Sequence, residues 1–164
     1  ANHIICAQDS PVMAVSYFED FDYTHSFESV KQQKFKDVKD NVLRLGFTKS
    51  IIWKKIKLNP NALESTAVLE INSPLLDEIT LYYSTKDDTK VVETLGIMYS
   101  QSKNKLDHYL PAFLIPVEKL KTPELYLKLK SRWTMSVSLS MKNKDVFHKE
   151  RVHTYFIVAL LLGG

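Results

Sequence analysis

Glycine and cysteine are scarce in this sequence, and their scarcity excludes several kinds of site. The chain of 164 residues contains four glycines and one cysteine, Cys6. Few glycines argue against the Gly-rich loops that cradle phosphate groups. A single cysteine excludes an intrachain disulfide and the Cys and His clusters of structural zinc sites. The sequence therefore predicts no cofactor.

Charge and composition are ordinary, which excludes other classes of protein. Apolar residues make up 45% of the chain and charged residues 25%, typical of one globular domain and not of a disordered chain. The net charge of +3 is too small to indicate nucleic acid by itself.

No arrangement of residues typical of catalysis is present. There is no G-x-S-x-G motif, and the five histidines show no H-x-x-x-H spacing. Cys6 lies near the N-terminus without an evident base. The sequence therefore predicts a protein that is not an enzyme and has no catalytic residues.

Two charged segments have alternative interpretations. The acidic residues at 19–22 and at 87–88 lack the glycine and the number of carboxylates of a calcium loop, so we expect solvated loops and no metal. Residues 28–57 carry nine basic and three acidic side chains with three interleaved aromatics, a pattern that nucleic-acid-binding surfaces also show. Because similar lysines occur throughout the chain, we expect a solvated face and no nucleic acid.

Alternating apolar and polar residues predict β-strands along most of the chain. In residues 135–141 methionine, valine and leucine occupy one face and three serines the other. Similar segments separated by turn residues lie at 52–58, 68–71, 79–83, 91–98, 109–115 and 125–130. About eight short strands predict an all-β protein, a sandwich or a jelly roll. One short helix is expected, with Ser26 as N-cap and with Phe27 and Val30 facing inward.

Strand periodicity also assigns side chains to the two faces of each strand. The expected core residues are Ile56, Leu69, Ile71, Leu81, Leu127, Val137 and Leu139. Four side chains then point away from that core, namely Trp53, Lys55, Tyr82 and Tyr126. If their strands share a sheet, these residues form either an open aromatic surface for a ligand or a second small core under a neighbouring segment.

The two ends of the chain have a different character from the middle. Residues 1–11 are interpreted as a flexible terminus or as the remnant of a secretory signal peptide. The run from Tyr155 to Leu162 is wholly apolar but too short to span a membrane. We expect residues 12–150 to form the sandwich and residues 151–164 to begin a membrane helix, not a core strand.

The order of several landmarks between Val12 and Phe147 resembles a known family. That family is the type-2 extracellular domain of bacterial seven-transmembrane receptors with diverse intracellular signalling modules. The landmarks are Glu19-Asp20, Ser26–Val30, Phe35, Leu45–Thr48, Trp53, Leu58-Asn59, Ile71–Tyr82, Gly96 and Tyr126–Ser131.

The resemblance implies a fold, a location and a function. It implies a jelly-roll-like β-sandwich similar to carbohydrate-binding modules, on the periplasmic or extracellular side of the bacterial inner membrane, followed by membrane helices. Family members often carry arginine where this chain has Lys55, and a basic residue after the glycine for which Lys103 is the nearest candidate. Lysine lacks the planar fork of arginine, so the ligand of another member does not transfer.

Two functions remain open at this point. The domain senses a small molecule, such as a glycan or a carboxylate, on the face of Trp53, Lys55, Tyr82 and Tyr126, with Lys103 at one rim. Alternatively, it is an interaction or homodimerisation domain without a small ligand. A pocket beside Trp53 would favour the first function, and a flat apolar patch with a symmetric contact the second.

Overall fold

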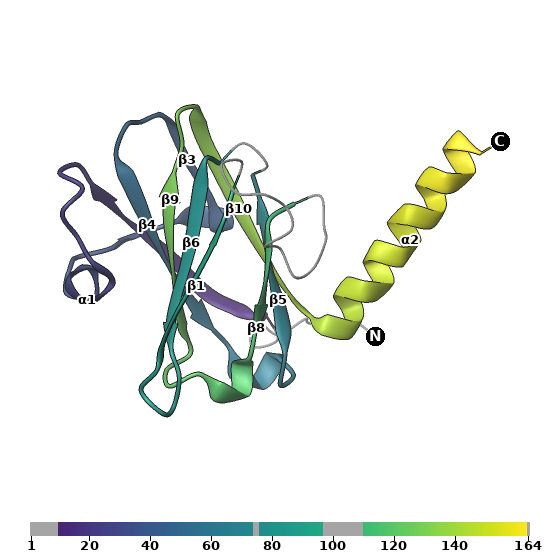
Figure 1. Ribbon diagram of the computed structural model, residues 1–164, viewed down its shortest axis with the longest axis horizontal. Coiled ribbons are helices and arrows are strands. Elements are labelled where there is room, and N and C mark those ends of the chain that lie inside the picture. Colours follow the sequence, from purple (N-terminus) through teal and green to yellow (C-terminus); the bar gives the residue numbers. More distant parts are fainter. Residues whose placement is uncertain (1–9, 74–75, 97–109, 164) are drawn as a thin grey trace, which may run out of the picture.

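The protein is a sandwich of two antiparallel β-sheets, as the sequence predicts. The computed structural model describes residues 10–73, 76–96 and 110–163. A six-stranded sheet has the order β2-β1-β4-β9-β6-β7, and a four-stranded sheet has the order β3-β10-β5-β8. Figure 1 shows the two sheets facing each other, with one helix beside each of them.

The described residues form ten strands, whereas the sequence predicted about eight. The six-stranded sheet contains β1 (Val12–Asp20), β2 (Lys36–Asp37), β4 (Ile51–Leu58), β6 (Glu78–Ser84), β7 (Lys90–Leu95) and β9 (Glu124–Lys130). The four-stranded sheet contains β3 (Val42–Phe47), β5 (Ala67–Asn72), β8 (Ala112–Ile115) and β10 (Thr134–Asn143). The first three strands were not predicted. Of these, β2 is only two residues long and β1 is half-covered on both faces.

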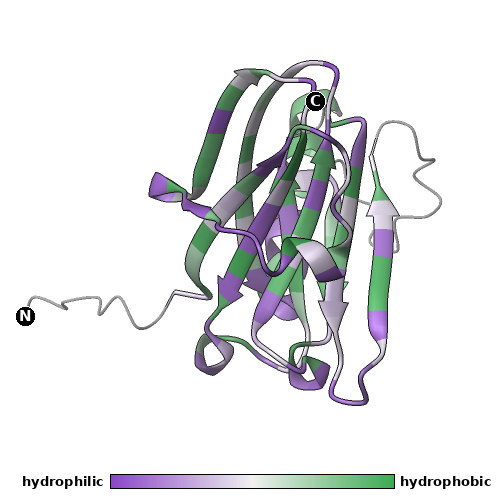
Figure 2. Cartoon of the chain, turned by 90° about the vertical axis from the view of Figure 1, so that its left-hand side faces the viewer, coloured by the Kyte–Doolittle hydropathy of each residue, from purple (hydrophilic) through white to green (hydrophobic). Residues whose placement is uncertain are grey.

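The main core lies between the two sheets and confirms the predicted strand faces. Six of the seven expected core residues are buried there, and Leu139 is partly buried against them. Figure 2 shows the underlying pattern as hydrophilic and hydrophobic bands that alternate along the strands. The register of β4 against β9 is regular from Ile52 opposite Leu129 to Lys57 opposite Glu124. Each side chain of β4 therefore has a fixed face.

The main core also contains a charged residue that was not expected there. Lys54 shares a face of β4 with Ile52 and Ile56, and its side chain is 0% exposed. Its Nζ donates a hydrogen bond of 3.2 Å to the backbone oxygen of Val137 in the opposite sheet. Burial lowers the pKa of Lys54 to about 8. Lys54 therefore links the two sheets through the centre of the molecule.

In the part of the chain that the structure describes, two α-helices accompany the sheets. The short α1 (Phe27–Val30) is capped by Ser26 as predicted. The described residues also form 3-10 turns at Lys39–Asn41 (η2), Pro60–Ala62 (η3) and Val117–Lys119 (η5). The longer α2 (Lys144–Leu162) begins before the expected residue 151, and its buried Phe147 packs on Val68 and Ala112. The C-terminal part of α2 projects away from the sandwich (Figure 1). Within the described residues, no helix has the length and hydropathy needed to cross a membrane.

Candidate ligand site

The outer face of the six-stranded sheet carries a second, aromatic core. Trp53, Tyr82 and Tyr126 point away from the main core, as strand periodicity predicts, and lie together. We call this group, with the residues that cover it, the outer aromatic cluster. Its members are Phe27, Val30, Ile51, Trp53 and Tyr126, with the partly buried Phe18, Phe35 and Tyr82.

The rings of the outer aromatic cluster pack in specific orientations. Phe27 stacks on Tyr82 with centroids 5.2 Å apart and meets Tyr126 edge-on at 5.4 Å. Trp53 lies 5.4 Å from Tyr82, and Phe35 lies 6.1 Å from Tyr126. Such offset and edge-on pairs each add about 0.5–1.5 kcal/mol beyond the area they bury. The cluster is therefore a well-packed unit.

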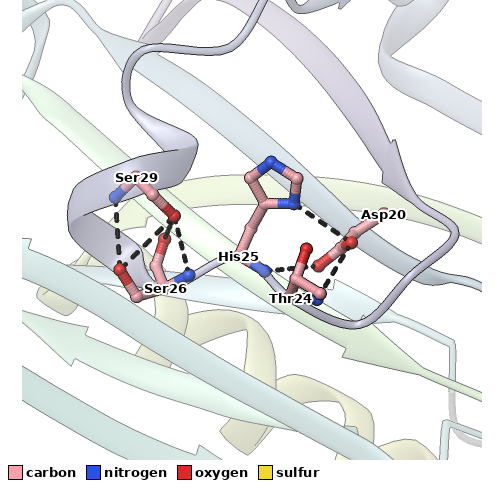
Figure 3. A network of polar contacts seen from close by, with 5 residues as sticks. All are labelled: Asp20, Thr24, His25, Ser26 and Ser29. Carbon is pink, nitrogen blue, oxygen red and sulfur yellow. Dashed lines mark hydrogen bonds and ion pairs between the residues drawn. The ribbon is translucent and has the colours of Figure 1, made fainter.

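Residues 21–35, which connect β1 to β2 and contain α1, cover this cluster; we call them the cover segment. Its helix starts at a reciprocal cap, because the Ser26 hydroxyl accepts from the Ser29 N–H and the Ser29 hydroxyl accepts from the Ser26 N–H. The cap fixes the position of Phe27 and Val30, which are both buried. Figure 3 shows this cap together with the polar contacts that precede it.

Asp20 holds the start of the cover segment. Its carboxylate accepts hydrogen bonds from the N–H groups of Thr24 and His25, and it lies 3.1 Å from the Nδ1 atom of His25 (Figure 3). Burial alone would raise the pKa of Asp20, but the bonds to His25 and Thr24 outweigh it and lower the pKa. The His25 ring packs edge-on against Phe18 at 5.0 Å. The loop is thus fixed on both its polar and its apolar side.

The cover segment decides between the two arrangements that the sequence left open. Trp53 is 1% exposed, so the aromatic face is a small core and not an open surface. A substitution at Trp53 therefore changes packing as well as any binding.

Within the described part of the chain, the Trp53 Nε1 atom is buried without a hydrogen-bond partner. The Nζ atom of Lys128 lies 5.6 Å from the centre of the Trp53 ring.

Cations surround the exposed edge of the cluster. The Nζ atom of Lys31 lies 3.9 Å from the centre of the Phe27 ring, and that of Lys55 lies 5.9 Å from the Tyr126 ring. Lys55 also forms an ion pair with Glu124 at 3.4 Å. Burial and the neighbouring Glu124 carboxylate raise the pKa of Tyr126 to about 12. At neutral pH its hydroxyl is therefore a protonated hydrogen-bond donor.

A hollow of about 250 Å³ lies at this edge, between α1 and the start of β9. One wall is aromatic, from Phe27 and Tyr126, and its polar groups are ammonium, hydroxyl and carboxylate. Lys121, one of these polar residues, is already paired with Asp88. The lining residues are Phe27, Lys31, Tyr83, Ser84, Lys121, Thr122, Glu124 and Tyr126.

Of the predicted site residues, the structure places some at the hollow and others away from it. Tyr126 lines the hollow, whereas Trp53 and Tyr82 lie in the cluster behind it and Lys55 lies beside Tyr126. Lys103 lies outside the described residues. Sequence reasoning did not place Lys31 of the cover segment, or Lys121, Thr122 and Glu124 at and just before the start of β9, in a site. The pattern of a loop does not reveal which sheet face the loop covers.

The family of the chain follows from its sequence as a whole. A search of curated proteins found no match. Residues 13–143, which include all ten described strands except the first residue of β1, match the family described as 7TMR-DISM extracellular 2. The chain therefore belongs to this family of extracellular sensor domains of seven-transmembrane receptors and lies on the periplasmic or extracellular side of the membrane.

Proposed function

We propose that this sensor domain recognises a small polar molecule, with a carbohydrate as the preferred class, in the hollow between Phe27 and Tyr126. The observation that carries the proposal is the combination of an aromatic wall with polar groups of both charges in one recess. A sugar presents apolar C–H groups to an aromatic ring and hydroxyls to polar side chains, and this lining offers a partner for each.

The lining also favours particular substituents on the ligand. Lys31 is exposed and forms no ion pair among the described residues, although the charge of the nearby Glu28 carboxylate interacts with it. Its ammonium group can donate to a carboxylate or a hydroxyl of a ligand. Glu124 can accept from sugar hydroxyls, although it also pairs with Lys55. The hollow lies below the usual range for small-molecule sites, about 300–1,000 Å³, which favours a single sugar ring or a short oligosaccharide end.

A saccharide panel tests the proposal. Neutral and acidic monosaccharides and disaccharides are titrated into the protein by calorimetry, and melting temperatures are followed in parallel. We expect one class to bind, and Lys31→Ala or Thr122→Ala to weaken its binding about fivefold or more, equivalent to about 1 kcal/mol. Lys34→Ala, which alters an exposed lysine of the same segment outside the hollow, is the matched control.

Two results would count against this site. No binding by any saccharide in the panel contradicts the proposed class of ligand. Binding that Lys31→Ala and Thr122→Ala leave unchanged, with both variants folded, contradicts the location.

Self-association through α2 is the second candidate function. The observation that favours it is the exposed apolar surface of this helix, on which Phe156, Leu160 and Leu161 are at least 62% exposed. Such a surface favours a partner, either a second copy of the helix or the membrane into which we propose that α2 leads. A concentration-dependent dimer in light scattering that Leu160→Glu abolishes would support self-association.

A further inference from the structure

A larger hollow, of about 500 Å³, opens at one end of the sandwich, and we call it the end cavity. Its walls come from the segments that carry the chain from one sheet to the other, between β4 and β5 and between β8 and β9, and from the β6–β7 turn. The lining residues are Leu58, Pro60, Leu63, Glu64, Ser65, Lys86, Val117, Glu118, Leu120 and Pro123.

The frame of the end cavity is fixed by backbone hydrogen bonds. The Lys86 N–H donates to the Lys119 oxygen at 2.9 Å, and the Leu58 N–H donates to the Pro123 oxygen at 2.8 Å. The Glu64 N–H donates to the Asn143 side-chain oxygen at 2.8 Å. These bonds join the turns of both sheets, so the cavity exists before any ligand binds, and little ordering is needed on binding.

The lining separates into an apolar floor and a charged rim. Leu58 and Leu120 belong to the main core, and Leu63 and Val117 are partly buried against it. The rim carries the exposed side chains of Lys86, Glu64 and Glu118. In the part of the chain that the structure describes, none of these three side chains forms an ion pair with another residue.

We propose that the end cavity binds a free amino acid with an apolar side chain. The ammonium group of such a ligand is complementary to Glu64 and Glu118, and its carboxylate is complementary to Lys86. The side chain of the ligand lies against Leu63, Val117 and the small exposed part of Leu120, whereas Leu58 is fully covered and only supports them. Burying an apolar group there is favourable. None of the lining residues is aromatic, so the cavity offers no stacking surface for a sugar ring.

This site is separate from the hollow proposed above for a carbohydrate. The two share no lining residue, and the segment from Leu120 to Glu124 lies between them. Either proposal can therefore fail without the other.

Calorimetry with three probes of similar shape tests the proposal on the full chain. L-leucine carries both charges, isocaproic acid lacks the ammonium group and isoamylamine lacks the carboxylate. We expect leucine to bind saturably. Each truncated probe should bind at least about tenfold more weakly than leucine, because it loses a charge-assisted contact. Lys86→Met should abolish the preference for leucine over isoamylamine, and Lys86→Arg should keep it.

The acidic side of the rim has a corresponding test. The double variant Glu64→Gln with Glu118→Gln should abolish the preference for leucine over isocaproic acid. Lys119→Met and Asp37→Asn are the controls, since each alters an exposed charge outside the cavity and should leave leucine binding unchanged. Absence of saturable leucine binding, or equal affinity in wild type and in folded rim variants, overturns the proposal.

Discussion

At the scale of single residues, Lys54 departs furthest from what a β-sandwich needs. Among the described residues its ammonium group has one acceptor, the backbone oxygen of Val137. Val137 lies just before Ser138, where β10 begins to pair with β5. The neighbours of Lys54 across the strands are Tyr17 and Leu127. A buried lysine with only a carbonyl partner favours the neutral amine, because desolvation penalises the charge. Lys54 thus lowers the stability of the folded state at neutral pH.

Lys54→Met should stabilise the protein. The folded-state pKa of Lys54 lies near 8, against the ordinary value of 10.5 for the unfolded chain, which corresponds to about 3 kcal/mol. Below pH 8 both states are protonated and the full destabilisation is present. Between pH 8 and 10.5 the folded state loses its proton first, so the stability of the wild type rises with pH.

Urea denaturation at pH 7 and pH 10 measures both effects. Lys54→Met should be more stable than the wild type at pH 7, and the difference should shrink at pH 10. Lys57→Met, at an exposed position of the same strand, should leave the stability unchanged at both pH values. A loss of stability in Lys54→Met at pH 7 would show that the contact with Val137 outweighs the desolvation of the charge.

Single residues also show how far the sequence could predict the site. The alternation in β4 correctly separated Ile52 and Ile56 from Trp53, and the same alternation places Lys54 in the core, although its charge argued for solvent. What covers Trp53 depends on a tertiary contact with Phe27, which lies on a different element. Periodicity assigns a face to a side chain but does not identify the segment that packs on that face.

At the scale of elements, the cover segment depends on a helix of four residues. A helix this short is not stable by itself, so its cap and its packing must hold it. The N-cap was predictable because Ser26 and Ser29 have the spacing of a reciprocal cap. By contrast, β1 was not predictable, since its two faces are covered to a similar extent and its sequence shows no clean alternation.

Ser26→Ala should loosen the cover segment without unfolding the sandwich. Loss of the cap typically costs about 1 kcal/mol, and the effect should concentrate at α1. Faster hydrogen exchange at residues 24–31, with little change in β9, is the expected result. Ser136→Ala, an exposed serine of β10, is the control, and equal protection in both variants would mean that aromatic packing alone holds the segment.

At the scale of the whole molecule, the sandwich encloses the main core, whereas α2 lies outside it. The all-β architecture followed from alternating segments and turn residues, whereas the start of α2 at Lys144 did not, because Lys142–Asp145 also reads as a turn. Within α2 only Phe147 is buried, against a small cluster on the four-stranded sheet. The helix therefore adds little to the stability of the sandwich beyond its first turns.

Deletion of residues 155–164 should leave the melting temperature within about 2 °C of the wild type, a change under about 1 kcal/mol. The deleted side chains are mostly exposed, so little apolar burial is lost. Phe147→Ala should instead cost about 3 kcal/mol, because it empties a buried position. A large loss of thermal stability after the deletion would place the end of α2 in the core of the domain.

The junction between β10 and α2 has a mechanical consequence. The strand ends at Asn143 and the helix begins at Lys144, so no flexible residues separate them. A helix turns about 100° per residue, and a strand advances about 3.3 Å per residue against about 1.5 Å in a helix. If the boundary moved by one residue, everything beyond it would rotate by roughly a quarter turn and shift along the axis by about 2 Å. A rearrangement of one residue at the edge of the sandwich would thereby become a screw motion of the whole helix.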